Sequence, residues 1–567
     1  MPKPKPKLMR LIALAIVMAL TIAACGGDGD DADTGNGDTG AEEGATLTFG
    51  TSADPVVLDG ALVSDGESLR AIDQMFEGLV TLAPGGTEVI PNLATEWTTS
   101  EDGRDWTFTL REEVTFHDGE PFNADAVCFN FDRWFNFTGS FQNPAATYYW
   151  QTVFGGFAKT DPDSGAPTES NFKSCTVDDE FTVTISLNEP SSSFLAAMAL
   201  TNFTFASPKA LEEFDADEGK VNAEGIFRAT GTYGTEHPTG TGPFMFEEWV
   251  RNDHLTMTKN PNYWAAEEQG NVETLIFRPI PDNAARLQAL QTGEIQGYDL
   301  VEPQDIPTIE GDENLQILDR PAFNVGYVGM NQAIKPLDDI EVRKAIAHAI
   351  DRQEVVDAYY AGQGQVATQF MPPEVFGYAD DVTTYEYDPD KAEQILTDAG
   401  YQLPVEISFA YPTDVSRPYM PVPQDNFEAM VADLEECCFK VKKESAIWSP
   451  DYLDNVDNGR YGLYLLGWTG DFGDPDNFIG TFFQTEQRAW GFDNQEIFDC
   501  LDAAETEVDP DARTAKYEDC NRLIMDFLPG LPYVHTKPAL AFAANVSGYA
   551  PSPVSLEPFS IVTVGGE

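Results

Sequence analysis

The residues best suited to chemistry lie between Leu463 and Phe478, in the sequence LYLLGWTGDFGDPDNF. The stretch begins as a short apolar run, which is typical of a buried strand. It ends in glycines, a proline and three carboxylates, Asp471, Asp474 and Asp476. A carboxylate held in a loop after a buried strand, beside the Trp468 ring, could receive an ammonium group at a cleft. The alternative is an Asp/Gly/Pro turn that only ends the strand.

The amino end has the order of features of an export signal. Lys3, Lys5, Lys7 and Arg10 precede an apolar run at 11–22, which is too short to cross a bilayer as a helix. The following Ile22-Ala23-Ala24-Cys25 resembles the lipobox of bacterial lipoproteins, in which the cysteine carries lipid. We therefore expect a signal peptide at 1–24 and lipid attachment at Cys25; a secreted protein with a chance cysteine is the alternative. Residues 25–45 are rich in glycine and acids, and are expected to form a disordered, lipid-anchored tether.

The charge of the chain restricts its partners. The sequence contains 95 acidic and 33 basic residues, which gives a formal net charge of −62. A nucleic-acid partner is not expected, because phosphate binding requires the opposite sign. Self-repulsion of this size weakens a fold at low ionic strength, so we hypothesise adaptation to a salty medium. A melting temperature that does not rise with salt would contradict this hypothesis.

Six cysteines follow Cys25, at positions 128, 175, 437, 438, 500 and 520. An even number in an exported chain indicates disulfides, and many pairings are possible. Proximity favours Cys128–Cys175 and Cys500–Cys520, which leaves Cys437 and Cys438 as a vicinal pair or as thiols. No CxxC pattern or histidine cluster accompanies the cysteines, so no metal site is expected.

Periodicity predicts alternating strands and helices along the body of the chain. In the first half, strands are expected at 46–49 and 106–110 and helices at 67–77 and 124–135. In the second half, an Asp cap, a proline in the first turn and a final glycine predict a helix from Asp388 to Gly400. Strands are expected at 405–411 and 463–468. A chain of this length requires two or more domains, and we expect an α/β protein with a largely parallel sheet in its second half.

Several motifs follow one another in a recognisable order. LATEW at 93–97, WTFTLR at 106–111, VTFHDG at 114–119 and FNAD at 122–125 come first. GTGPF at 240–244, NPNYW at 260–264 and VRKAIAHAIDR at 342–352 come later. In this order they resemble the bacterial extracellular solute-binding proteins of family 5, the peptide-, dipeptide- and nickel-binding subunits of ABC importers. The resemblance covers residues from about 46 to 560.

The resemblance implies a two-lobed periplasmic-binding-protein-like fold of type II, in its large cluster C form, with an extra subdomain in the first lobe. It places lobe I at 46–280, with the subdomain at about 90–235, lobe II at 281–530, and a return segment to lobe I at 531–567. Chain crossings near 278–282 and 527–533 would form a hinge. Two lobes joined by a hinge can capture a ligand by closing over it.

The same resemblance implies roles for individual residues. In dipeptide-binding members an acid after a Gly-Trp strand holds the α-ammonium of the ligand, and Asp471 in GWTGD matches that acid. An arginine in an RPYxP element holds the ligand carboxylate, and Arg417 in SRPYMP matches that arginine. Both ligand charges need partners, because a closed cleft removes their water. The remaining implied ligand-binding residues are Trp468, Thr469, Gly470, Ser52 and Ala53.

We therefore expect a monomeric substrate-binding lipoprotein on the outer face of the cell membrane, which takes a short, dipeptide-like peptide. It would deliver the peptide to ABC permease subunits powered by a separate ATPase, and it would use no cofactor. Within the family, nickel or metallophore binding and oligosaccharide binding are the alternatives; the aromatic residues Trp134, Tyr148, Tyr149 and Trp150 keep the second one open.

An enzyme is the alternative of another class. A glycosidase needs two carboxylates at a cleft, and 95 acids make chance pairs uninformative. The sequence contains no G-x-S-x-G, HExxH, Walker or dinucleotide-binding motif. We therefore expect no enzymatic activity.

Overall fold

The computed structural model describes residues 44–144, 146–221, 227–554 and 556–565. The expected signal peptide, Cys25 and all but the last two residues of the expected tether lie outside the described residues. Residues 44–567 form one compact unit. Across the described ranges, no helix combines the length and the apolar composition that a membrane crossing requires.

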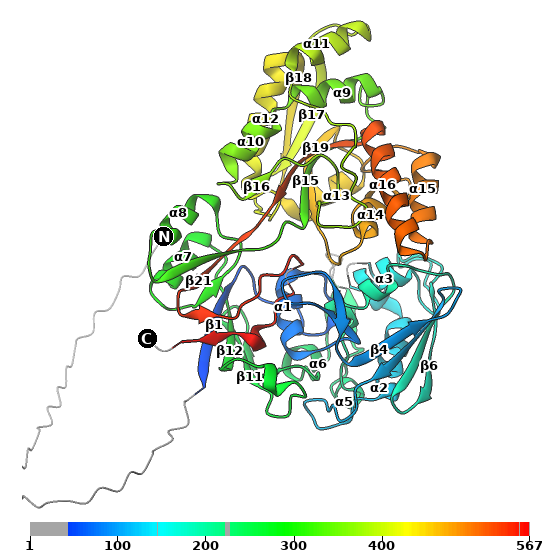
Figure 1. Cartoon of the computed structure of the whole chain (residues 1–567), viewed down its shortest axis with the longest axis vertical. Helices are drawn as coiled ribbons and strands as arrows, with labels where there is room; N and C mark the ends of the chain where they lie inside the picture. Colours follow the sequence, from blue (N-terminus) through cyan, green and yellow to red (C-terminus); the bar gives the residue numbers. More distant parts are fainter. Residues whose placement is uncertain (1–43, 145, 222–226, 555, 566–567) are drawn as a thin grey trace, which may run out of the picture. The chain divides into compact units, whose positions relative to one another are not determined.

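The first sheet is organised around β1 (Ala45–Thr51), in which Leu47 and Phe49 are fully buried. β1 runs parallel to both of its neighbours, β12 and β13. The strand order is β10 (Phe244–Val250), β11 (His254–Lys259), β12 (Val272–Pro279), β1, β13 (Gly297–Tyr298), β21 (Ala539–Ala543) and β14 (Leu315–Asp319). Figure 1 shows the blue β1 and the red β21 in this one sheet, which therefore joins the two ends of the described chain. We refer to 44–319 with 539–565 as lobe I.

Lobe I also contains a four-stranded antiparallel sheet within the expected subdomain. Its order is β4 (Ala94–Thr99), β5 (Asp105–Leu110), β7 (Thr182–Leu187) and β6 (Phe172–Asp179). Helix α2 (Ala124–Phe135) begins after Asn123, whose side chain accepts from the Ala126 amide. The disulfide Cys128–Cys175 joins α2 to β6. The other elements of lobe I are α1 (Gly66–Met75), β2 (Val80–Leu82), β3 (Val89–Pro91), α3 (Tyr148–Phe154), α4 (Phe194–Ala197), α5 (Pro208–Glu213), β8 (Gly219–Val221), β9 (Phe227–Ala229), α6 (Tyr233–Glu236), α7 (Asn283–Gln291), α8 (Ile306–Glu310), β22 (Val546–Ser547) and β23 (Thr563–Val564).

Lobe II, residues 324–536, is built on a six-stranded sheet. Its order is β16 (Gly364–Gln365), β20 (Gly530–Thr536), β15 (Asn324–Met330), β19 (Leu463–Thr469), β17 (Val405–Pro412) and β18 (Phe439–Ala446). β17 is parallel to β18 and β19, but β15 is antiparallel to both β19 and β20. The expected largely parallel sheet is therefore mixed, because β15 and β20, the strands by which the chain enters and leaves the lobe, run in opposite directions.

Helices surround this sheet, as Figure 1 shows. They are α9 (Ile340–Ala349), α10 (Arg352–Tyr359), α11 (Pro389–Asp398), α12 (Pro423–Cys437), α13 (Leu453–Asp457), α14 (Ile479–Phe483), α15 (Gln495–Glu505) and α16 (Pro510–Phe527). The predicted helix after Asp388 is confirmed: its carboxylate accepts from the Lys391 amide at 2.9 Å, and Gly400 has a φ of +87°. A disulfide joins Cys437 to Cys438 where α12 ends, and another joins Cys500 on α15 to Cys520 on α16.

The chain crosses between the two sheets at 320–323 and at 537–538. These positions differ from the expected boundaries at 280 and 530, because β13 and β14 pair within the lobe I sheet and β20 pairs within lobe II. Strands as short as β13 carry no periodic signal. Arg320 at the first crossing forms buried ion pairs with Asp299 and Glu557, which Arg70 also contacts.

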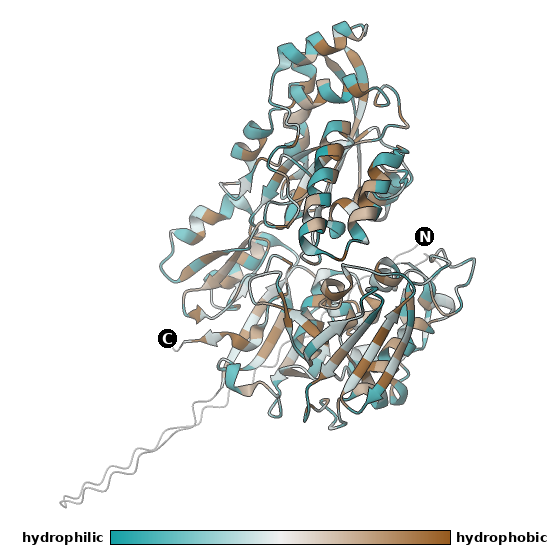
Figure 2. Cartoon of the chain, turned by 45° about the vertical axis from the view of Figure 1, so that its right-hand side comes forward, coloured by the Kyte–Doolittle hydropathy of each residue, from teal (hydrophilic) through white to brown (hydrophobic). Residues whose placement is uncertain are grey.

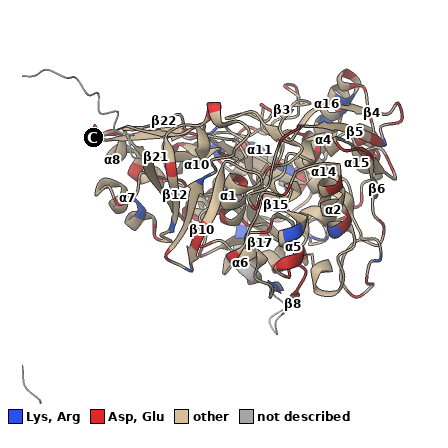
Figure 3. Ribbon diagram, turned by 90° about the horizontal axis from the view of Figure 1, so that it is seen from below, with Lys and Arg blue, Asp and Glu red and all other residues tan. Residues whose placement is uncertain are grey.

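The surface and the interior differ sharply in composition. Figure 2 shows brown, apolar residues along the strands and many teal, polar residues along the outer helices. Figure 3 shows Asp and Glu at many more positions than Lys and Arg. Few of the Asp and Glu residues that the structure describes are buried, and the core that holds each lobe together is apolar and aromatic.

Candidate functional site

The predicted strand before the carboxylates is confirmed as β19, whose first three residues, Leu463–Leu465, are buried. It pairs with β15 from Asn324↔Thr469 to Met330↔Leu463. The chain then turns at Gly470, whose amide donates to the Phe323 carbonyl at 2.9 Å. A Cβ at Gly470 would collide with the rings of Phe323 and Phe478, so the turn requires glycine. We call residues 470–477 the acid loop.

Asp471 lies where the acid loop meets lobe I. The Tyr149 hydroxyl on α3 donates to its Oδ1 at 2.8 Å, and the Asn477 amide donates to its Oδ2 at 3.2 Å. Burial raises the pKa of Asp471 to about 6, and the two hydrogen bonds act in the opposite direction. No Lys or Arg of the described residues forms an ion pair with this carboxylate. It is therefore a half-buried, partly desolvated carboxylate whose ionised form a cation would stabilise.

The other two carboxylates of the acid loop have different surroundings. Asp474 is buried and forms a two-pronged ion pair with Arg513 on α16, at 2.7 and 2.8 Å. Burial, and then repulsion from Glu505 and Asp474, raises the pKa of Asp476 well above its usual range. Asp474 is thus a structural ion-pair partner, whereas Asp471 has the free cation-binding capacity.

Arg417 lies in the loop 413–421 after β17, which we call the arginine loop. Its backbone pairs with Met420 through two hydrogen bonds of 3.1 and 2.9 Å, and its guanidinium lies 4.7 Å from the centroid of the Trp448 ring. Within the described part of the chain it forms no ion pair with a carboxylate. Arg417 also lines a cavity of about 40 Å³ together with lobe I residues such as Val301 and Ile306 and with the crossing segment at 537–538.

The two loops leave the same edge of the lobe II sheet. Asn324 pairs with Thr469 at the end of β19, and its side chain donates to the Thr536 carbonyl at 3.0 Å. The Thr536 hydroxyl in turn donates to the carbonyl of Pro418, next to Arg417, at 2.8 Å. The structure therefore brings Asp471 and Arg417, neither of which has an ion-pair partner among the described residues, to one side of lobe II, both against residues of lobe I.

The other implied site residues divide into two groups. Trp468 and Thr469 are half-buried beside Asp471, and Trp468 Nε1 donates to Asn477 Oδ1 at 3.4 Å. Ser52 is engaged elsewhere, because its amide and hydroxyl both donate to Glu67 at 2.8 and 2.6 Å. Ala53 is exposed. Among the described residues, neither Ser52 nor Ala53 forms a hydrogen bond with the acid loop or with Arg417.

Sequence reasoning missed three contributors to the site. Tyr149 was noticed only as one of several aromatic residues, and nothing in the sequence places it beside Asp471. Asn477 belongs to an Asp-Pro-Asp-Asn turn, a signal that could have identified it. Phe472 follows Asp471 in lobe II, yet its buried side chain packs in the lobe I core.

The aromatic residues that favoured oligosaccharide binding lie mostly in the interior. Trp134 and Trp150 are buried and pack in the subdomain core, with ring centroids 6.5 Å apart. They are therefore unavailable as a platform for a sugar ring. The described residues also contain no group of three or more His, Cys, Asp or Glu side chains that could hold a metal ion.

Comparison with known proteins gives consistent results. The sequence model of the bacterial extracellular solute-binding proteins, family 5, matches residues 88–490. The dipeptide-binding protein of Escherichia coli strain K12 is 32% identical over 531 residues, covering 92% of this chain and 94% of the relative. The structure of HbpA2 from Haemophilus parasuis has a TM-score of 0.77 at 28% identity, covering 92% and 100% of the two chains. The periplasmic binding protein DppA from Helicobacter pylori, in complex with the peptide STSA, has a TM-score of 0.75 at 26% identity, covering 92% and 98%.

Proposed function

The chain belongs to the bacterial extracellular solute-binding proteins of family 5, and from this premise we propose that it captures short peptides of dipeptide length between its two lobes. The main support for this ligand is the surroundings of the Asp471 carboxylate. Its carboxylate is half-buried, has no cationic partner among the described residues, and contacts lobe I through Tyr149. The α-ammonium of a peptide would supply the missing positive charge.

Arg417 would bind the other end of the peptide. A guanidinium offers two parallel N–H groups to a carboxylate, and Arg417 has no carboxylate partner among the described side chains. Because Asp471 and Arg417 are fixed on two loops of one lobe, a peptide must have a suitable length to reach both. The relatives named for dipeptide binding support this assignment.

The proposal extends to the setting of the protein. A monomer tethered by lipid at Cys25 to the outer face of the membrane would keep the lobes near ABC permease subunits. The closed, loaded form would dock on those subunits, and a separate ATPase would supply the energy. The proposed role includes no catalytic step, because capture and release need only the opening and closing of the lobes.

Calorimetric titration of the purified protein in high-salt buffer tests the ligand class. The ligands are a free dipeptide, the same dipeptide acetylated at its amino end, and the same dipeptide amidated at its carboxyl end. We expect the free dipeptide to bind, acetylation to abolish binding, and amidation to weaken it. Equal binding of all three would contradict recognition of the terminal charges.

Two further ligands test the alternatives within the family. Cello- or xylo-oligosaccharides and nickel with histidine are titrated under the same conditions. Binding of a sugar or of the nickel complex, together with no binding of dipeptides, would replace the proposed ligand and leave the family assignment intact.

A further inference from the structure

Asn477 contacts both the backbone and the side chain of Asp471. Its Oδ1 accepts from the Asp471 amide at 2.7 Å, and its Nδ2 donates to Asp471 Oδ2 at 3.2 Å. The same Oδ1 also accepts from Trp468 Nε1 at 3.4 Å. Asn477 is only 4% exposed, so water cannot easily replace these contacts. One amide side chain thus fixes the position of the carboxylate and of the loop that carries it.

The position of Asn477 is itself supported by two helices of lobe II. It ends a short 3₁₀ turn (Pro475–Asn477) that begins at Asp474, whose carboxylate accepts from the Asp476 amide at 3.0 Å. Arg513 on α16 holds Asp474 by two hydrogen bonds, and its Nε donates to the Ala504 carbonyl on α15 at 3.3 Å. The chain of contacts therefore runs from two helices to the ligand-facing carboxylate.

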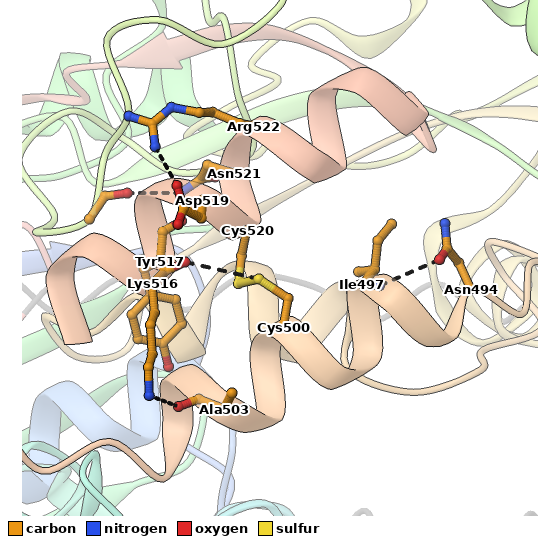
Figure 4. The surroundings of a disulfide bond; sticks show 11 residues. Asn494, Ile497, Cys500, Ala503, Lys516, Tyr517, Asp519, Cys520, Asn521 and Arg522 are labelled. Carbon is orange, nitrogen blue, oxygen red and sulfur yellow. Dashed lines mark hydrogen bonds and ion pairs between the residues drawn. A yellow bond between two sulfur atoms is a disulfide. The ribbon is translucent and has the colours of Figure 1, made fainter. Parts of the chain in front are cut away.

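A covalent bond fixes those two helices to each other. Figure 4 shows the disulfide Cys500–Cys520 between α15 and α16, with Lys516 Nζ donating to the Ala503 carbonyl beside it. A binding group is most precise when its supports are locked by packing and hydrogen bonds of their own. The acid loop is supported in this way, and in the series of contacts from the disulfide through Arg513 and Asp474, Asn477 is the residue that touches Asp471.

The charges around Asp471 determine how much the hydrogen bond from Asn477 affects its ionisation. Tyr149 donates to Oδ1 from α3, and burial followed by the nearby Asp471 charge raises the pKa of the neighbouring Tyr148 phenol. The negative charges of Asp65 and Asp457 also reach these phenols: Asp65 contributes to the raised pKa of Tyr149, and Asp457 to that of Tyr148. The surroundings of Asp471 are therefore negatively charged. On its own loop, Asp474 is neutralised by Arg513. Hydrogen bonds from Tyr149 and Asn477 are therefore what favours the ionised form of Asp471 against burial.

We propose that Asn477 is a positioning residue that orients the Asp471 carboxylate and keeps it ionised for the ammonium group of the ligand. The ligand part of this inference rests on the proposed function. Without Asn477, the acid loop would lose its contact to the Asp471 amide, and the carboxylate would bind a proton more readily. Peptide affinity would then fall, and it would fall most at mildly acidic pH.

The test compares Asn477→Leu, which keeps the branched shape and removes both hydrogen-bonding groups, with Asn477→Ser, which replaces the amide with a single hydroxyl that can still donate or accept. The matched control is Asn331→Leu, since Asn331 is a buried lobe II asparagine that contacts Gly459, Arg488 and Ala333. Dipeptide affinity is measured from pH 5 to pH 8. We expect Asn477→Leu to weaken binding about ten- to a hundredfold at pH 7 and to move the acidic fall in affinity to higher pH.

The expected results for the other two variants follow from the same contacts. Asn477→Ser should recover part of the loss, and Asn331→Leu should lower the melting temperature without moving the pH profile. A merely structural role for Asn477 would give the control's result. An unchanged pH profile in Asn477→Leu would therefore overturn the inference.

Two measurements need no ligand and separate this inference from the proposed function. Carbon NMR of aspartate carboxyls, with the Asp471 signal assigned by its loss in Asp471→Asn, should show a higher pKa for Asp471 in Asn477→Leu. If the variants do not fold, amide exchange in the wild type decides. Protection of the Asp471 amide comparable to that of β19 supports the inference, and exchange at the rate of an exposed loop overturns it.

Discussion

The acid loop and the arginine loop leave the same sheet edge, but they hold their charges in different ways. Asp471 is half-buried and partly desolvated, and it is held from three directions, by Tyr149, by Asn477 and by the turn at Gly470. Arg417 is exposed, pairs with Met420 through its backbone and stacks on Trp448. A charge interaction is strong where water is excluded and weak where the charge remains solvated. Under the proposed function, this difference predicts strict recognition of the amino end of a peptide and more tolerant recognition of its carboxyl end.

Neutralising Asp471 should cause the largest loss of dipeptide affinity. Asp471→Asn removes the charge partner of a buried ammonium group, which typically costs about 4 kcal/mol, or roughly a thousandfold in Kd. Calorimetric titration with a free dipeptide measures the loss. A reduction of less than about tenfold would mean that the acid loop does not hold the amino end.

The same substitution should have the opposite effect on the stability of the ligand-free protein. The folded-state pKa of about 6 lies above the unfolded value of about 4, so the folded protein binds this proton more tightly than the unfolded chain does. The ionised carboxylate therefore lowers stability above pH 6, and this penalty fades as the pH falls from 6 to 4. We expect Asp471→Asn to raise the free energy of unfolding by up to about 3 kcal/mol at pH 7 and by little near pH 4.

Denaturant unfolding of the wild type and of Asp471→Asn across this pH range checks that prediction. Taking the difference between the two proteins cancels the other acids. A variant that is less stable than the wild type at pH 7 would show that the carboxylate contributes to the fold instead of burdening it.

Removing the other charge should have a smaller effect. We expect Arg417→Ala to weaken dipeptide binding about tenfold, because an exposed guanidinium contributes less than a desolvated carboxylate. Arg460→Ala is the control, since Arg460 is also exposed on lobe II and bonds to Asn455. If Arg417→Ala were as damaging as Asp471→Asn, the two loops would be equivalent and the comparison would fail.

The contact with lobe I should have a modest effect of its own. Tyr149→Phe removes the hydroxyl that bonds to Asp471 and should weaken dipeptide binding about fivefold, since the carboxylate then loses one donor and lobe I one contact. Tyr148→Phe changes the adjacent phenol, which does not bond to Asp471, and should leave the affinity unchanged. Equal losses in the two variants would assign the effect to α3 as a whole.

The smallest expected effect is that of ionic strength on the loss of affinity in each variant. Raising the ionic strength from about 0.15 M to 1 M shortens the screening length from about 8 Å to about 3 Å. The affinity ratio between wild type and Arg417→Ala should then fall from about tenfold to about threefold. The ratio for Asp471→Asn should stay constant. A matching decline in both ratios would show that Asp471 is as solvated as Arg417.

Local elements of the fold were predictable from the sequence, since their signals are local. The apolar run at 463–468 marks β19, and the cap at Asp388 marks the start of α11. The mixed direction of the lobe II sheet was not predictable, because it depends on pairing between β15 and β20, which lie far apart in the chain. The position of the chain crossings was missed for the same reason: β13 has only two residues and is defined by its neighbours.

In the candidate site too, local features were predictable from the sequence and long-range contacts were not. The type and the position of Asp471, after a buried strand and among glycines, could be recognised from the sequence. Its main partner on lobe I could not, because Tyr149 lies 322 positions away. The Cys500–Cys520 pairing was favoured by proximity, but its place in the support of the acid loop depends on Arg513 and Asp474, which only the fold brings together.

The buried Phe472 has a kinetic consequence. It extends from lobe II into the apolar core of lobe I, so the lobes cannot separate without exposing a benzyl group to water. That exposure costs about 2 kcal/mol, a contribution that by itself favours the shut form by roughly thirtyfold. This contribution lowers the fraction of time that the entrance is open, and the association rate of a ligand falls with that fraction. The same side chain therefore slows both the entry and the escape of a ligand.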